Sequence, residues 1–133
     1  MRNIVAAVYG TLKQGYGNHY YLRNSKYLGK GVSLQGFLLG HSSFPAVIPW
    51  ENGVPIVVEL YSVSRRTLMQ LDRLEGVPTL YKRSSFLFRT EKGTITAMLY
   101  FMEETNELFN WELPEKKFPY WWTKKGWIPW KIK

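Results

Sequence analysis

The sequence contains no cysteine and only two histidines, His19 and His41. Without cysteine there is no disulfide scaffold, no cysteine nucleophile, no iron–sulfur cluster and no thiolate zinc site. Neither histidine has a partner at the spacing of a metal site, so we interpret both as structural or surface residues. The motifs G-x-S-x-G and H-E-x-x-H are also missing, which removes the common hydrolase signatures.

Long hydrophobic runs are missing as well. No stretch approaches the ~20 apolar residues that cross a membrane. The apolar run at residues 4–8 is shorter than the core of a signal peptide. We therefore expect a cytoplasmic protein that does not enter a membrane.

The 133 residues include 17% aromatics and carry a formal charge of +8, which is unevenly distributed. Residues 1–112 hold 12 Lys and Arg against 9 Asp and Glu, whereas residues 113–133 hold 6 Lys against one Glu. We predict one domain over 1–112 and an aromatic, lysine-rich extension over 113–133 that packs onto it with its lysines in water. Alternatively, the interleaved Trp and Lys bind nucleic acid, a membrane interface or a protein partner.

The first half of the chain is predicted to form mostly β-strands. The run at 4–8 predicts a strand buried on both faces. Asn18 could cap a short helix that ends near Asn24. Residues 27–39 have a β-like pattern that is broken by Gly29, Gly31 and Gly36, and residues 43–49, with two prolines, predict an irregular or edge segment.

A strand at 54–63 is followed by a helix, because Ser64 suits the N-cap of a helix over 65–74. Gly76 stands where a helix C-terminus is expected, and further strands are predicted at 81–88 and 94–102. About five or six strands and two short helices indicate an α+β fold. Its sheet is mostly antiparallel or mixed and could curl into a barrel.

A glycine-rich loop follows the first strand. Its residues Gly10–Gly15 fit the first part of a phosphate-binding loop, but Tyr16 and Gly17 replace the required Lys-Ser/Thr, which argues against nucleotide hydrolysis. A strand that enters a glycine turn exposes backbone N–H groups, which can hold an anion or an oxyanion. A plain tight turn remains the simpler interpretation.

Two acids, Asp72 and Glu75, fall in the last turn of the predicted helix. The negative end of the helix dipole disfavours a carboxylate there, and burial would raise its pKa further. Glu75 is thus a candidate general base, with a solvated surface acid as the alternative. Asp72 is interpreted as a surface acid paired with Arg73 or Arg66.

Two motifs and a short segment together resemble the gamma-glutamylcyclotransferase-like superfamily, in particular its gamma-glutamylamine cyclotransferase and AIG2-like branch. The resemblance covers about residues 3–102. The first motif is Val8-Tyr9-Gly10-Thr11-Leu12-Lys13-x-Gly15-x-x-Asn18-His19, and the short segment is Phe44-Pro45-Ala46-Val47. The second motif is Glu59-Leu60-Tyr61-x-Val63 followed by Leu71-Asp72-x-Leu74-Glu75-Gly76-x-Pro78-x-x-Tyr81-x-Arg83.

This resemblance implies a small barrel flanked by short helices, with a cavity at one end and no cofactor or metal. Its members release 5-oxoproline from gamma-glutamyl compounds by attack of the α-amine on the γ-carbonyl. The resemblance makes Glu75 the acid/base residue. The substrate-binding residues that we expect are Tyr9, Gly10, Thr11 and Leu12, which act mainly through backbone atoms, with Tyr81 and Tyr100 as pocket-lining candidates or plain core aromatics.

A second hypothesis is a non-catalytic binding module. In this case the pocket holds a small anionic or amino-acid-like ligand, or the basic aromatic tail binds nucleic acid or a protein partner. The position of Glu75 discriminates the two, because a base must line a pocket beside the Gly10 loop.

Overall fold

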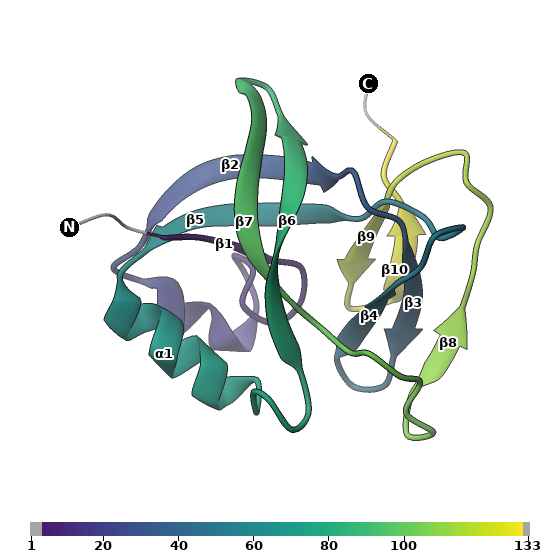
Figure 1. The fold of residues 1–133 in the computed structure, drawn as a ribbon, viewed down its shortest axis with the longest axis horizontal. Helices are drawn as coiled ribbons and strands as arrows, with labels where there is room; N and C mark the ends of the chain where they lie inside the picture. Colours follow the sequence, from purple (N-terminus) through teal and green to yellow (C-terminus); the bar gives the residue numbers. More distant parts are fainter. Residues whose placement is uncertain (1–3, 132–133) are drawn as a thin grey trace.

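The computed structural model describes residues 4–131 of the chain, and strands dominate it (Figure 1). One α-helix and one 3-10 helix accompany them. In chain order the elements are β1 (Ile4–Val8), η1 (Gly17–Leu22), β2 (Lys26–Ser33), β3 (Phe37–His41), β4 (Pro45–Pro49), β5 (Val57–Val63), α1 (Arg65–Leu74), β6 (Lys82–Thr90), β7 (Gly93–Phe101), β8 (Asn110–Glu112), β9 (Tyr120–Thr123) and β10 (Gly126–Pro129).

Five strands form a closed barrel in the order β1-β5-β2-β6-β7. All neighbours are antiparallel except β1 and β7, which pair in parallel and close the barrel. In Figure 1 the long β6–β7 ribbon crosses the three remaining strands. The predicted α+β class, with a mixed and mostly antiparallel barrel, is therefore confirmed.

The side chains of β5 alternate between the two faces of the barrel wall, and each face packs into a different buried cluster. Ile56, just before the strand, and Val58 and Leu60 within it lie in one buried cluster, as their alternation predicts. Tyr61 and Val63 lie in a second cluster, against α1. The first strand contributes to both clusters, which confirms that it is buried on both faces.

Helix α1 begins and ends where the sequence predicts. The Ser64 side chain accepts a hydrogen bond from the Thr67 N–H at 3.1 Å, which is an N-cap interaction. Leu68 and Leu71 are buried against the barrel wall. The helix ends before Gly76, whose φ of +67° is a backbone conformation that favours glycine.

The β-like segment predicted over 27–39 forms two strands, β2 and β3, which are separated near Gly36. The chain leaves the barrel after β2 and enters a second sheet of order β4-β3-β8. Gly36 lies at this junction, and a Cβ there would stand 2.7 Å from the Gly53 carbonyl oxygen. Strand β4, with Pro45 and Pro49 at its ends, occupies an edge of this sheet as its prolines require.

Asn18 does not cap a helix, contrary to the prediction. The segment is a short 3-10 helix that starts at Gly17 and has Tyr16 at its N-cap. The Asn18 side-chain amide instead donates to the Thr11 hydroxyl at 2.8 Å. Asn18 therefore links η1 to the loop that follows β1.

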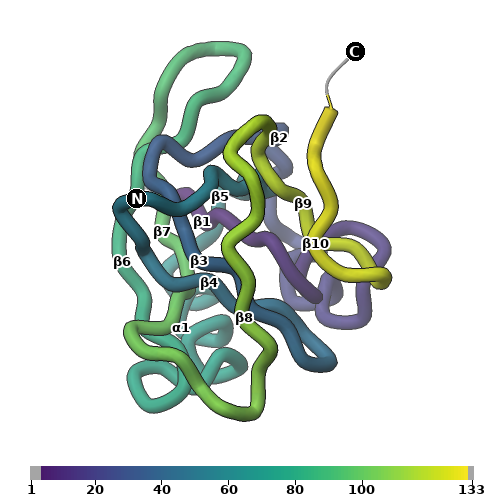
Figure 2. Tube along the Cα trace, turned by 90° about the vertical axis from the view of Figure 1, so that its right-hand side faces the viewer, coloured from purple at the N-terminus to yellow at the C-terminus, as the bar shows by residue number. Residues whose placement is uncertain are grey.

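The C-terminal residues form a β9–β10 hairpin that lies beside the segment following β1, as two perpendicular views agree (Figures 1 and 2). Tyr120, Trp122 and Trp127 are buried in the cluster that fills the barrel. Lys124 and Lys125, in the hairpin turn, are exposed. None of the helices in residues 4–131 combines the length and hydrophobicity needed to cross a membrane.

Candidate active site

A cavity of about 240 Å³ opens where β1 and α1 both end. It brings together every residue that the sequence analysis proposed for a site: Tyr9, Gly10, Thr11, Leu12, Glu75, Tyr81 and Tyr100. These residues come from the loop after β1, the end of α1, the start of β6 and strand β7. The barrel therefore gathers segments that are far apart in the sequence.

The loop after β1 is held in a compact turn. The Lys13 N–H donates to the Gly10 carbonyl at 3.1 Å, and the Asn18 N–H donates to the Thr11 carbonyl at 3.0 Å. Gly10 also packs closely against β4, since a Cβ at this position would stand 2.8 Å from the Pro45 Cγ. Glycine is thus required here by close approach.

Three successive N–H groups of this loop are available to a ligand. Among the hydrogen bonds of residues 4–131, none has the backbone N–H of Gly10, Thr11 or Leu12 as its donor. All three residues line the cavity. Backbone N–H groups without an internal acceptor can bind anionic oxygens, including an oxyanion that develops during a reaction.

Glu75 occupies the C-cap of α1, where its N–H donates to the Leu71 carbonyl at 2.9 Å. Its side chain is half-buried and lines the cavity. Burial raises the pKa of the Glu75 carboxyl from 4.5 to about 7. Such a group exchanges a proton readily near neutral pH, as a general acid/base must.

Three tyrosines surround the cavity, and the protein itself binds all three hydroxyls. Tyr9 donates to the Tyr100 carbonyl at 2.8 Å, and Tyr81 donates to the Pro45 carbonyl at 2.7 Å. Burial, together with the nearby Glu75 carboxylate, raises the pKa of both phenols well above 10. They therefore stay neutral and shape the cavity.

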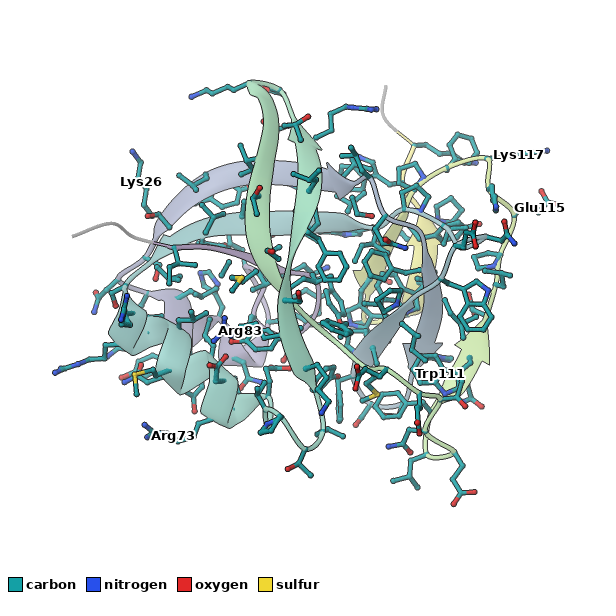
Figure 3. All side chains as sticks on the ribbon, in the orientation of Figure 1. Lys26, Arg73, Arg83, Trp111, Glu115 and Lys117 are labelled. Carbon is teal, nitrogen blue, oxygen red and sulfur yellow. The ribbon has the colours of Figure 1, made fainter. Side chains whose placement is uncertain are left out.

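Tyr100 is held by the only aspartate of the sequence, Asp72. The Tyr100 hydroxyl donates to the Asp72 carboxylate at 2.7 Å. Arg83 binds both oxygens of the same carboxylate, at 2.7 and 3.0 Å, and reaches from β6 toward α1 (Figure 3). The predicted pairing of Asp72 with Arg73 or Arg66 is wrong, because the barrel brings β6 alongside the helix.

The remaining polar candidates show no arrangement typical of a metal centre. Within residues 4–131 there is no group of three or more His, Cys, Asp or Glu side chains that could hold a metal ion. Nδ1 of His19 lies 2.9 Å from the Leu12 carbonyl oxygen. The His19 ring thus contacts the main chain of the loop that follows β1.

Several other lining residues were not proposed as site residues from the sequence. They are Ala7, Val8, Asn18, Ser43, Phe44, Pro45, Leu74 and Leu80. Phe44 and Pro45 belong to a segment that the resemblance pointed to, and Asn18 belongs to the first motif. Ser43 and Leu80 lie in connecting segments without periodicity, so no sequence pattern indicated them.

A comparison with known protein families identifies the family of this chain. The family model described as "Gamma-glutamyl cyclotransferase, AIG2-like" matches residues 6–122. The chain belongs to this family. The match confirms the resemblance read from the two motifs, and it extends beyond the predicted domain boundary at residue 112, which stays a prediction.

Individual relatives of this AIG2-like chain agree with the family match. A provisionally named gamma-glutamylcyclotransferase of Methanocaldococcus jannaschii is 39% identical over 100 residues, covering 74% of this chain and 83% of the relative. A human protein named gamma-glutamylaminecyclotransferase is 34% identical over 88 residues, covering 58% of this chain and 56% of the relative.

A solved structure extends the comparison to the fold. The crystal structure of an AIG2-like protein from Mus musculus superimposes with a TM-score of 0.71 at 24% identity, covering 81% of this chain and 83% of that chain. At this identity the likeness shows the shared fold.

Proposed function

We propose that this AIG2-like protein is a cytoplasmic enzyme that releases 5-oxoproline and a free amine from gamma-glutamyl amines. In such a substrate the α-amine and the γ-carbonyl belong to one molecule. Once the chain is curled, closure of a five-membered ring has a favourable effective molarity. The enzyme must therefore hold the curled form, move protons and stabilise an oxyanion.

Glu75 moves the protons in this proposal. The α-nitrogen forms a bond to the γ-carbonyl carbon, and the bond from that carbon to the leaving nitrogen breaks. Of the three ammonium protons, one stays on the lactam nitrogen and two reach the leaving amine, which departs as an ammonium ion. Glu75 takes these protons from one nitrogen and returns them to the other, one at a time.

The backbone N–H groups of Gly10, Thr11 and Leu12 complete the proposed site. As the γ-carbonyl becomes tetrahedral its oxygen gains negative charge, and fixed donors stabilise that charge. The observation that carries the proposal is a carboxyl with a pKa of about 7 in the same cavity as three uncommitted N–H groups.

The charge of the cavity supports an amine as the leaving group. Glu75 is the only charged residue among those that line it. A leaving amino acid joined through its α-nitrogen would bring a second carboxylate, besides that of the γ-glutamyl group, next to the broken bond, and no lining Lys or Arg is available to pair with it. An amine without an adjacent carboxylate avoids this cost. The human relative's printed name fits the same chemistry.

The proposal is tested by incubating the protein with gamma-glutamyl-ε-lysine and measuring 5-oxoproline by mass spectrometry. The matched control is the same compound with an acetylated γ-glutamyl α-amine, which lacks the nucleophile. We expect 5-oxoproline from the first compound alone. Failure to convert this compound and a panel of other gamma-glutamyl amines would contradict the proposal.

The binding-module hypothesis receives less support. Glu75 lines a cavity beside the Gly10 loop, as the catalytic hypothesis requires. Trp122 and Trp127 are buried and so are not free to stack on bases. Nucleic-acid binding by the rest of the tail stays a prediction.

A further inference from the structure

Lys13 follows Leu12 directly in the loop and is completely buried, with 0% of its surface exposed. A lysine is almost never fully buried without a compensating partner. Its ammonium nitrogen donates to the Trp122 carbonyl. The same nitrogen lies 3.5 Å from the centre of the Trp121 ring and 4.9 Å from that of the Tyr16 ring. Strand β9 therefore supplies most of the ammonium's environment.

Glu59 supports the loop on the same side. It is only 5% exposed and accepts hydrogen bonds from the Gln14 N–H at 2.9 Å and the Tyr61 hydroxyl at 3.0 Å. Burial lowers the pKa of Lys13 to about 8, while Glu59 opposes this change and the neighbouring Lys30 adds to it. The ammonium thus keeps its charge at neutral pH.

The main chain of Lys13 closes the turn that presents the free N–H groups. Its N–H donates to the Gly10 carbonyl at 3.1 Å, while its side chain bonds to β9, 109 positions away in the sequence. Among residues 10–13, Lys13 alone bonds to the C-terminal hairpin, whereas Tyr16, farther along the same loop, also contacts the hairpin at Lys124. The side chain of one residue therefore connects two distant segments at the edge of the cavity.

We propose that Lys13 is a positioning residue, which uses the β9 anchor at Trp121 and Trp122 to fix the N–H groups of Gly10–Leu12 for the γ-carbonyl oxygen. The inference rests on the proposed function and extends it. It makes the C-terminal hairpin a support of the reaction, although the hairpin itself does not line the cavity.

The size of the effect follows from the chemistry of oxyanion donors. Loss of one such donor costs on the order of 10²–10³ in kcat, and a displacement of about 1 Å can cost ~10². Lys13→Met keeps a long side chain and removes the charge. Because the transition-state oxygen needs the donors more than the substrate does, we expect kcat to fall by about 10- to 100-fold and KM to change less.

Lys30→Met is the matched control. The Lys30 ammonium lies 5.6 Å from the same Trp121 ring, but the residue is exposed on β2 and outside the cavity lining. We expect its kcat to stay within about twofold of wild type. Lys13→Arg retains a cation and should recover part of the activity. Trp121→Leu tests the same contact if Lys13→Met does not fold, and should also lower kcat.

All assays are run well below the melting temperature of each variant. A Lys13→Met protein that melts at a lower temperature but keeps the wild-type kcat would overturn the inference, because Lys13 would then be merely structural. Amide hydrogen exchange gives a readout without turnover. We expect faster exchange at Gly10–Leu12 in Lys13→Met than in Lys30→Met, and equal exchange would overturn the inference. A wild-type protein inactive on every gamma-glutamyl amine would instead contradict the proposed function.

Discussion

Two glutamates flank the loop that follows β1, and their surroundings differ sharply. Glu59, on the side of the C-terminal hairpin, is buried and accepts two hydrogen bonds, from Gln14 and Tyr61. Glu75, on the cavity side, is half-buried, and within residues 4–131 no side chain or backbone N–H donates to its carboxylate. The same loop thus separates an acid that is hydrogen-bonded within the protein from one whose side chain lines the cavity.

This difference indicates that Glu59 supports the structure and that Glu75 can act as an acid or base. Glu59 is held by donors of the protein, whereas Glu75 has only the cavity beside it, and partial burial disfavours its charged form. Burial thereby moves the pKa of Glu75 to about 7. Groups whose pKa is shifted in this way concentrate at functional sites.

Replacing Glu75 by Gln gives the largest effect that we expect on activity. The change keeps the shape of the side chain and removes its ability to accept and return a proton. Release of 5-oxoproline should fall by roughly 10²- to 10⁴-fold. Steady-state assays with the active gamma-glutamyl amine measure the loss, and a variant that turns over at the wild-type rate would remove Glu75 from the mechanism.

Replacing Glu59 by Ala should mainly reduce stability. The Gln14 N–H and the Tyr61 hydroxyl lose their acceptor in a buried region, so the free energy of unfolding should fall by about 2–4 kcal/mol. Urea unfolding measures this loss. Glu107→Ala, at an exposed position, is the control and should stay within ~0.5 kcal/mol of wild type. Equal stabilities of the two variants would show that Glu59 is not a structural acid.

Glu75→Gln should also change stability, but in the opposite direction. Because the folded-state pKa of Glu75 lies above its ordinary 4.5, at about 7, the folded chain binds the proton more tightly than the unfolded chain. The stabilisation from this carboxyl is complete below pH 4.5 and is lost as the pH rises to about 7.

Glutamine is neutral throughout this range, so the stability of the variant does not fall as the pH rises from 4.5 to about 7. Its melting temperature should therefore exceed that of wild type by roughly 10 °C at pH 8 and match it near pH 4. Differential scanning calorimetry at the two pH values makes the comparison. A variant that is less stable than wild type at pH 8 would mean that the ionised carboxylate has favourable partners.

The local elements were predictable from the sequence because each has a local cause. Strand β1 follows from its apolar run, and α1 follows from the Ser64 cap and the spacing of its leucines. Glu75 could be singled out because its helix ends in a Gly-x-Pro turn and because the motif points to it. The gathering of all seven proposed residues around one cavity follows from these elements once the barrel closes.

The contacts that could not be predicted connect segments distant in the sequence. Pairing of β3 with β8 joins positions near 40 to positions near 111, and no local pattern encodes it. The Asp72–Arg83 pair depends on how β6 lies against α1. Lys13 belongs to the first motif, but its burial could not be predicted, because its partners at Trp121 and Trp122 come from the tail.

The central claim is that burial leaves the Glu75 carboxyl uncompensated, and a direct titration tests it. Glutamate labelled with ¹³C at its carboxyl carbon can be followed by NMR as the pH is varied, with the Glu75→Gln variant identifying the resonance. We predict a midpoint of about 7 for Glu75. A midpoint near the ordinary value of 4.5 would contradict the account.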